Sequence, residues 1–318
     1  MKITVIGGSG AIGCVLVPEL VQSGHDVCAM QHQTPLPYDG VRVVPGSITD
    51  PAAVAAAVEG ADVVMQLTKG GGGIEQVVET SVRGTVNVLD AIRNAGTIGQ
   101  YLLTSSDAAT GIGAHPYPEP ISHRTSPVSY GDYYSLGKVL EETIVTDYDR
   151  NHGVPYTIAR LSWTQREDMI LRHLIAGYDR ERPTRGPFGA AYSADQVQRL
   201  ESGERFVALP YGADGRPLGR TLVQRHDVIA ALVAMVGAEK AIGETFHVSG
   251  RGFHYDRPAE YLAGKVGLPV EQVAVPEEYS YDIDFSHTTE RLGWAPKYDV
   301  LAMIDAGLAW KETQCGTT

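Results

Sequence analysis

The chain has 318 residues, of which 43% are hydrophobic, and it carries a formal net charge of −12. This length is enough for one large α/β domain, or for a main domain with a smaller one attached. An acidic chain repels nucleic-acid phosphates and anionic lipid, so we expect neither as a partner.

Cysteine spacing and apolar runs bear on metal binding and on compartment. Cys14, Cys28 and Cys315 are far apart and form no CxxC or Cys/His spacing, so we expect no metal site. The apolar run at residues 3–6 is too short for a secretory signal, and no run approaches the ~18–20 apolar residues that span a bilayer. We therefore expect a cytoplasmic protein with reduced thiols.

Strand and helix patterns alternate over the first half of the chain. Short runs rich in β-branched residues predict strands at residues 3–6, 27–30, 41–44, 63–67, 101–104 and 156–159. Helical patterns lie between them, at residues 11–21, in an alanine-rich stretch that starts at Asp50-Pro51, and at residues 74–94 and 132–148. Strands separated by helices predict parallel βαβ units and a doubly wound sheet.

The alternation weakens after Arg160. Late strands are predicted at residues 221–223 and 245–248, with a helix at 227–236 between them. The other late segments mix charge, proline and glycine without a clear period. We therefore predict two units, the first made of residues 1–165 and 221–248, and the second of residues 166–220 and 249–318.

A glycine-rich turn joins the first predicted strand to the first helix, where residues 7–13 read Gly-Gly-Ser-Gly-Ala-Ile-Gly. Gly7 permits unusual backbone angles, Gly10 lets a pyrophosphate approach the backbone, and Gly13 allows close packing of helix and strand. Free N–H groups and the helix dipole then favour an anion. The strand–turn–helix context predicts a dinucleotide-binding loop, with a purely structural turn as the alternative.

Tyr134 and Lys138 form a YxxxK spacing inside a predicted helix, so they share one helical face. A free tyrosine has a pKa near ~10, and a nearby cation lowers that pKa by favouring the phenolate. The pair is therefore a candidate general acid–base group. Tyr130 and Tyr133 have no lysine four residues later, which leaves Tyr134 as the choice.

The spacing Gly7-x-x-Gly10-x-x-Gly13 resembles the extended short-chain dehydrogenase/reductase family, the group of NAD-dependent epimerases and dehydratases. Residues 82–90 resemble its central helix, and residues 290–296, Glu-Arg-Leu-Gly-Trp-Ala-Pro, resemble its C-terminal signature. The resemblance covers nearly the whole chain. It implies an α/β, Rossmann-type doubly wound parallel sheet that binds the dinucleotide, with a smaller, discontinuous C-terminal α/β substrate domain, in a homodimer.

The resemblance also implies a hydroxyl beside Tyr134. Counting back from Gly111, Ser106 matches the catalytic serine or threonine, and its neighbour Ser105 is the alternative. Dehydratase relatives carry an Asp–Glu pair at the positions of Asp107 and Ala108. Since alanine cannot transfer a proton, we interpret Asp107 as a turn residue, and dehydration is disfavoured.

The expected cofactor is NAD, with NADP as a second option. By resemblance, the cofactor would contact the glycine loop, the strand ends and the acid–base pair: Gly7, Ser9, Gly10, Ala11, Ile12, Gly13, Gln31, Ser47, Ile48, Leu67, Thr68, Thr104, Tyr134 and Lys138. Gln31 stands where many members carry the ribose-binding Asp, so the choice of cofactor is weakly specified. Ser81 replaces the usual Asn of the central helix, and the glycines at residues 70–73 either let the backbone approach the cofactor or form a linker.

The expected substrate site departs from the sugar-nucleotide enzymes. Arg220 matches an arginine that grips the diphosphate, with a solvated surface position as the alternative, and Trp163 replaces an Asn. An indole has one donor and a large apolar face, so Trp163 either faces a sugar ring or belongs to the core. We expect a sugar or sugar acid without a UDP handle, held by Ser106, Asp107, Trp163 and Arg220.

Taken with the resemblance, these residues predict an NAD(P)-dependent oxidoreductase or epimerase. It would act on a carbinol or carbonyl of a sugar or sugar-derived substrate through a Ser-Tyr-Lys site. One alternative is a nucleotide-sugar 4-epimerase or dehydratase. A further alternative is a non-catalytic NAD(P)-sensing protein on the same fold, against which the Tyr–Lys pair argues.

Overall fold

The computed structural model describes residues 1–70 and 72–315. Gly71, within the glycine run predicted to approach the cofactor, lies outside the described residues, as do residues 316–318 of the predicted second unit. No helix in the described part of the chain is both long enough and apolar enough to cross a membrane.

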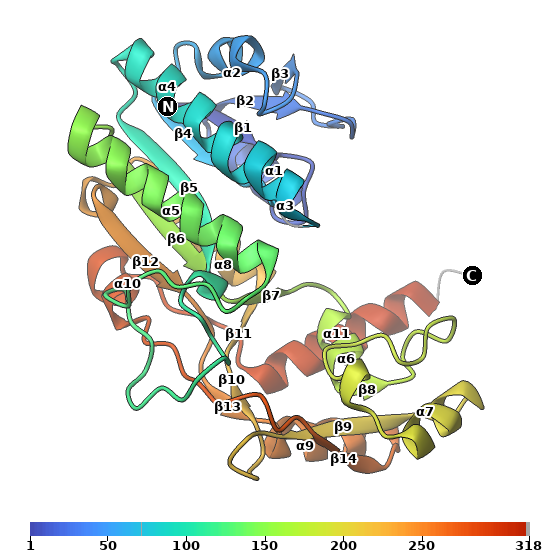
Figure 1. Ribbon diagram of the computed structural model, residues 1–318. Helices are drawn as coiled ribbons and strands as arrows, with labels where there is room; N and C mark the ends of the chain where they lie inside the picture. Colours follow the sequence, from blue (N-terminus) through green and yellow to red (C-terminus); the bar gives the residue numbers. More distant parts are fainter. Residues whose placement is uncertain (71, 316–318) are drawn as a thin grey trace.

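A seven-stranded sheet forms the centre of the larger unit, in the order β12-β6-β5-β4-β1-β2-β3 (Figure 1). Every neighbouring pair in it is parallel. Its strands are β1 (Lys2–Ile6), β2 (Asp26–Gln31), β3 (Arg42–Pro45), β4 (Val63–Gln66), β5 (Gln100–Ser106), β6 (Tyr156–Leu161) and β12 (Glu244–Val248). The predicted α/β class and doubly wound parallel sheet are therefore confirmed.

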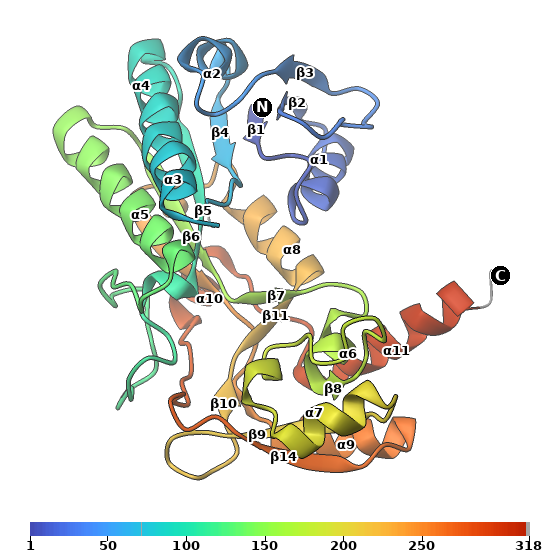
Figure 2. The same cartoon turned by 45° about the vertical axis from the view of Figure 1, so that its right-hand side comes forward.

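Helices cover both faces of this sheet (Figure 2). One face packs against α1 (Gly13–Gln22) and α8 (Arg225–Met235), and the other against α2 (Pro51–Val58), α4 (Thr85–Ala95) and α5 (Tyr133–His152). Adjacent strand residues enter opposite cores, as Val5 and Ile6 of β1 do. This alternation explains why the strands are apolar throughout, since both faces of the sheet are buried.

The helix predicted at residues 74–94 is present without a break, but it is not α-helical throughout. It consists of α3 (Ile74–Gln76), a π-helical segment η1 (Val77–Gly84) and then α4. Tertiary contacts accompany the wider turn: the Ser81 hydroxyl is drawn into a hydrogen bond with Glu141 of α5, and Gly84 packs closely against Ile48. A hydrophobic pattern with a period near 3.6 residues does not distinguish a π-helical segment from an α-helix, because the apolar residues of the segment still lie on one face.

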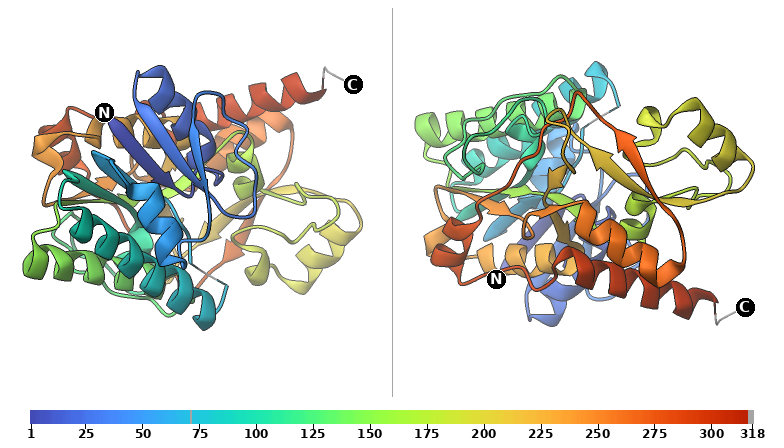
Figure 3. Two further views of the ribbon diagram at one scale, coloured as in Figure 1. Left: turned by 90° about the horizontal axis from the view of Figure 1, so that it is seen from above. Right: turned by 90° about the horizontal axis from the view of Figure 1, so that it is seen from below.

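A second group of elements lies below the sheet in Figure 1 and has its own core, to which Phe206, Leu262 and Ile304 contribute. Its small sheet joins β14, β9 and β8, and α9 and α11 lie side by side (Figure 3). The bounds are α6 (Met169–Leu174), β8 (Ile175–Ala176), η3 (Gly189–Ala191), α7 (Ala194–Glu201), β9 (Phe206–Tyr211), α9 (Asp256–Val266), β14 (Val270–Ala274) and α11 (Val300–Cys315).

Short strand pairs connect the two regions. β7 (Trp163–Gln165) pairs in parallel with β11 (Leu222–Gln224), and β10 (Gly219–Arg220) pairs with β13 (Phe253–His254). Two further elements are η4 (Glu239–Ala241), which precedes β12, and α10 (Ser286–Leu292), which follows β14. Trp294, just after α10, packs into the core shared with α1 and α8.

Candidate active site

The strand order turns back between β1 and β4, which places a crevice at their carboxyl ends. Leu67, which follows β4, donates its N–H to the carbonyl oxygen of Ile6 at 2.8 Å and joins the two strand ends. A cavity of about 820 Å³ opens at this point. It extends from the glycine loop past Tyr134 to Trp163.

The glycine loop forms one wall of the cavity. Gly7 has a φ of +96°, in the left-handed region that favours glycine. A Cβ at Gly13 would lie 2.5 Å from the carbonyl oxygens of Gly7 and Gly8, so no larger residue fits there. At Gly10, the sole neighbour of such a Cβ within 4 Å would be the Gly7 oxygen at 3.3 Å. The loop therefore leaves open space over free N–H groups, which fits a pyrophosphate.

The far end of the cavity is formed by residues after β2 and β3. Ser47, Ile48 and His32 line it. Gln31 lies outside this lining, because its side-chain carbonyl accepts a hydrogen bond from the Leu36 N–H at 3.0 Å. His32 was not among the predicted cofactor contacts, although the residue after a parallel strand is a natural ligand-facing position.

Lys138 lies in the first half of α5, with its ammonium group buried beneath Tyr134. Its Nζ donates to the carbonyl oxygens of Thr68 at 3.1 Å and Thr104 at 2.9 Å, and to a carboxylate oxygen of Glu141 at 2.8 Å. These bonds use all three of its N–H donors. Lys138 therefore acts on Tyr134 as a charge and not as a hydrogen-bond donor.

Tyr134 lines the cavity with its phenol next to Ser106. Burial raises the pKa of Tyr134, while Lys138 and a hydrogen bond from Ser106 act against the rise. The hydroxyl of the alternative serine, Ser105, donates a hydrogen bond to a carboxylate oxygen of Glu142 at 2.5 Å. The structure thus brings Ser106, Tyr134 and Lys138 together, and the Ser106 hydroxyl donates to an Asp107 carboxyl oxygen at 3.1 Å.

Asp107, which the sequence suggests is a turn residue, is buried at the cavity. It begins the short helix η2 (Asp107–Ala109), and its carboxyl is 3% exposed and lines the cavity. Burial raises the pKa of Asp107 to about 7, against opposing hydrogen bonds from Ser106 and the Ala108 N–H. Its Oδ2 has no hydrogen-bond partner among the described residues. A carboxyl with this pKa can be protonated or ionised near neutral pH.

This raised pKa predicts a pH-dependent cost to folding. An unfolded Asp ionises near ~3.9, whereas Asp107 in the folded chain keeps its proton to about 7. The folded state binds more protons between these limits, so stability falls as the pH rises through them. We expect Asp107→Asn to gain stability relative to the native chain as the pH rises from about 4 to about 7. Thermal unfolding of both proteins across this range would show it, and a constant difference in Tm would contradict it.

Trp163 lies on β7 with its indole 43% exposed, and it lines the cavity. Its ring meets the buried His173 ring edge-on, with the centroids 4.7 Å apart and an interplanar angle of 70°. An exposed aromatic face at the edge of a cavity fits the pocket-wall alternative better than the core alternative.

Arg220 is 7% exposed and is not solvated. Its guanidinium donates to the carbonyl oxygens of Gly219 at 3.0 Å and Tyr279 at 2.7 Å, and it is ion-paired with Glu278. It also lies over the Tyr281 ring, 4.8 Å from the centroid. Tyr281 lines the cavity, whereas Arg220 lies behind it. The charge that would grip a diphosphate is therefore already matched by a carboxylate.

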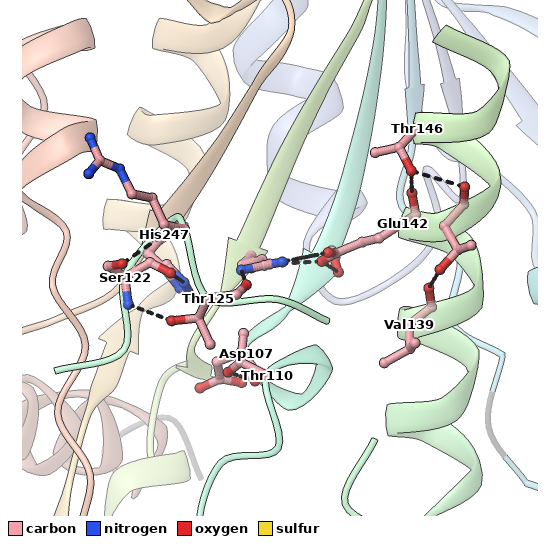
Figure 4. A network of polar contacts seen from close by, with 12 residues as sticks. Asp107, Thr110, Ser122, Thr125, Val139, Glu142, Thr146 and His247 are labelled. Atoms are coloured by element: carbon pink, nitrogen blue, oxygen red, sulfur yellow. Dashed lines mark hydrogen bonds and ion pairs between the residues drawn. The ribbon is translucent and has the colours of Figure 1, made fainter. Parts of the chain in front are cut away.

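A buried ion pair supports the strand that carries Ser106. Arg160 of β6 binds Glu142 of α5 through its Nε at 3.0 Å and its Nη2 at 2.8 Å, and it donates to the Thr125 carbonyl at 2.8 Å. Glu142 also accepts the hydrogen bond from Ser105. Figure 4 shows how this network joins α5 to the loop that holds Thr125 and Ser122. It fixes β5, α5 and the loop relative to one another.

Two charged residues near the phenol were not identified from the sequence. Lys69 lines the cavity, with its ammonium 4.9 Å from the centroid of the Tyr134 ring. Glu141 is fully buried and contacts Lys138. Each had a signal: Lys69 closely follows a strand end, and Glu141 shares a helical face with Lys138 through an i,i+3 spacing.

Metal ligands do not gather in the described part of the chain. Among those residues, no three His, Cys, Asp or Glu side chains are placed to hold one ion. Cys14 is a free, exposed thiol and Cys28 is free and buried. The cavity lining includes hydroxyl, phenol, ammonium and carboxyl groups.

Known proteins resemble this chain in sequence and in fold. The NAD dependent epimerase/dehydratase family model matches residues 3–164. A 2-alkyl-3-oxoalkanoate reductase of Stenotrophomonas maltophilia is 32% identical over 184 residues, which span 55% of this chain and 54% of that protein. The low-salt glycan biosynthesis protein Agl12 of Haloferax volcanii is 26% identical over 324 residues, covering 94% of each chain.

A solved structure shares the fold over the whole length. It is a short-chain dehydrogenase/reductase superfamily protein from Agrobacterium tumefaciens with bound NAD. The TM-score is 0.84 at 21% identity, and the match covers 100% of this chain and 99% of that one. The structural likeness therefore includes both regions of the chain. By contrast, the chain matches about half the length of the 2-alkyl-3-oxoalkanoate reductase.

Proposed function

Because this chain belongs to the NAD dependent epimerase/dehydratase family, we propose that it oxidises or reduces a carbinol or carbonyl carbon of a sugar-like substrate. One observation carries the proposal: Ser106, Tyr134 and Lys138 converge on a cavity that continues to the glycine loop. A single cavity can thus hold a dinucleotide and a small substrate together.

The proposed reaction uses Tyr134 as the proton-transfer group. In oxidation the phenolate takes the carbinol proton, and in reduction the phenol returns it. Ser106 donates a hydrogen bond to the reacting oxygen, and the Lys138 ammonium stabilises the phenolate by its charge. Bound NAD supplies the hydride acceptor, and its reduced form the donor.

We place NAD along the cavity, with its pyrophosphate on the glycine loop of residues 7–13. Ser47 and Ile48 would lie at the adenine end, and Lys138 near the nicotinamide ribose. His32, and not a carboxylate, follows β2 in the cavity lining, so a 2′-phosphate would meet no repelling charge there and NADP is admitted as well. The aromatic and hydroxyl lining supports a substrate site that begins at Trp163.

The substrate class that we favour is a sugar or sugar acid without a nucleotide handle. A diphosphate needs several donors to replace its water. Arg220 is already paired with Glu278, and Trp163 supplies a single donor. Trp163 instead offers an apolar face of the kind that packs on sugar rings. We assign the substrate domain to residues 166–220 and 249–318, which contribute Tyr281 to the cavity beside Ser106 and Trp163, and we propose a cytoplasmic homodimer.

Cofactor binding gives the direct test. NAD at 100 times its Kd should stabilise the folded chain by about 2.7 kcal/mol. Gly10→Ala is the variant to compare, because its Cβ would lie 3.3 Å from the Gly7 oxygen, a close contact that a small shift relieves, and we expect it to crowd the pyrophosphate. Thermal unfolding of the native chain and of Gly10→Ala, with NAD and with NADP, measures the stabilisation. Turnover of a panel of sugars and sugar acids is measured next. If neither NAD nor NADP stabilises the native chain, the proposal is contradicted.

A separate measurement tests the alternative that the substrate is a nucleotide sugar. Calorimetry with UDP and UDP-glucose should detect no binding if the favoured class is right. Micromolar binding of UDP that is lost in Arg220→Ala would instead assign the chain to the nucleotide-sugar epimerases. Cofactor binding without turnover of any substrate would favour the sensing alternative.

A further inference from the structure

The buried carboxylate of Glu141 contributes nothing to the three-residue mechanism above, yet it lies directly against that site. One of its oxygens accepts a hydrogen bond from Ser81 at 2.7 Å, and the other is 2.8 Å from the Lys138 ammonium. Glu141 and Ser81 have no exposed surface, and Lys138 is 3% exposed. An arrangement so fully satisfied is a built feature of the site and not a chance surface ion pair.

The packing around Ser81 is shaped for this contact. A Cβ at Gly70 would lie 2.4 Å from the Ser81 hydroxyl, and a Cβ at Gly137 would lie 2.9 Å from it. These two glycines let the π-helical segment η1 approach α5 until the hydroxyl meets the carboxylate. Ser81 then holds Glu141 at a fixed place opposite the ammonium.

The electrostatic consequence follows from charge alone. Burial by itself would lower the pKa of Lys138, but the Glu141 and Tyr134 charges together raise it. Burial raises the pKa of Glu141, and Lys138 opposes the rise, so we treat the two as a coupled ion pair. In such a pair the carboxylate offsets part of the ammonium charge that acts on a neighbour. Lys138 lowers the pKa of Tyr134 and Glu141 opposes that effect in part.

We propose that Glu141 is a positioning residue that acts through Lys138. Its carboxylate fixes the ammonium under Tyr134 and offsets its charge, so the phenol keeps its proton to higher pH than it would beside an uncompensated lysine. The phenol, which is the proton-donating form, is then the resting form at neutral pH. The effect on turnover rests on the proposed function, whereas the effect on the phenol does not.

The other groups that face Tyr134 and Glu141 act on the same balance. Burial and the Asp107 charge raise the pKa of Tyr134, and the Ser106 hydrogen bond lowers it. Lys69 lies over the phenol ring, and Tyr130 lines the same cavity. Tyr101 and Glu142 face the Glu141 side. Of these charged groups, Glu141 contacts the ammonium directly, and so its removal changes the pair most.

The decisive variant is Glu141→Gln. The amide keeps the volume, its oxygen can accept from Lys138, and its NH₂ can donate to the Ser81 hydroxyl. Removing one negative charge lowers the pH at which the first proton leaves the Tyr134–Lys138 pair. We expect the Tyr134 phenol to titrate at a pH lower by on the order of one unit. If the proposed function holds, the acid limb of the oxidation rate shifts in the same direction.

The phenol is read without substrate or cofactor, from the NMR shift of ring-carbon-labelled tyrosine, assigned with Tyr134→Phe. Glu79→Gln is the control, since that carboxylate is exposed on η1 and pairs with Arg83. Ser81→Ala keeps the Glu141 charge and should leave the titration close to native. An unchanged Tyr134 titration in Glu141→Gln would overturn the proposal, as would equal shifts in Glu141→Gln and Ser81→Ala.

The native chain gives an independent outcome if Glu141→Gln does not fold. Its Tyr134 signal should remain that of the neutral phenol up to a pH of about 10, the ordinary value for tyrosine. Titration of Tyr134 well below that pH would overturn the proposal. Absence of NAD binding would remove the proposed function but would leave the titration result standing.

Discussion

Tyr134→Phe should lower turnover by about 10²–10⁴-fold while the fold and the cofactor affinity survive. The substitution removes one oxygen, which is the group that transfers the proton. The ring remains in place at the start of α5, where Asp132 caps the helix by accepting a hydrogen bond from the Ser135 N–H at 2.6 Å. Steady-state rates and calorimetry with NAD would measure the two effects separately.

A matched control stands one residue earlier. Tyr133 belongs to the same helical turn, but its side chain is 51% exposed and lies outside the cavity lining. Tyr133→Phe should therefore leave turnover near the native rate. If Tyr134→Phe keeps near-native turnover as well, Tyr134 is not the acid–base group.

Arg160→Met should cost about 3–5 kcal/mol of stability. The substitution keeps much of the side-chain volume, but it leaves Glu142 as an unpaired charge that is 1% exposed. It also removes the donor to the Thr125 carbonyl. Urea unfolding of the ligand-free protein would measure the loss as a lower midpoint.

The partner substitution separates charge from packing. In Arg160→Met/Glu142→Gln the stranded carboxylate is gone, so the double variant should lose less than Arg160→Met alone. A double variant that loses as much as the sum of the two single variants would show that the ion pair is not the cause. Ser105, whose hydroxyl binds Glu142, would then have to be tested by itself.

The larger sheet was predictable because its strands are signalled locally. Runs such as residues 63–67 are buried on both faces, so their composition alone marks them. The second region gave no such signal. Its small sheet joins β8, β9 and β14, which are distant in sequence, and its two-residue strand β8 has no period to detect. Long-range pairing decides those elements, and propensity does not.

The residues of the candidate site also divide into those that the sequence predicts and those that it does not. Gly7 and Gly13 are recognisable because few other residues suit their positions: Gly7 has a positive φ, and a Cβ at Gly13 would clash with backbone oxygens. Asp107 looks like a turn residue in the sequence, and its burial follows from tertiary packing that no local pattern encodes. Glu141 similarly resembles an ordinary charged position on a helix. Its contact with Ser81 spans 60 residues and depends on the wider turns of η1.

The sheet that carries the glycine loop is assembled from segments that are separated in the sequence. The family match ends at residue 164, but the sheet needs β12, all five residues of which pair with β6. It also needs α8, which covers the same face as α1. A chain truncated after β7 would expose β6 as an open edge beside an uncovered apolar surface, a template for aggregation. Any recombination that transplants this cofactor-binding sheet must therefore carry α8 and β12 as well as the first 164 residues.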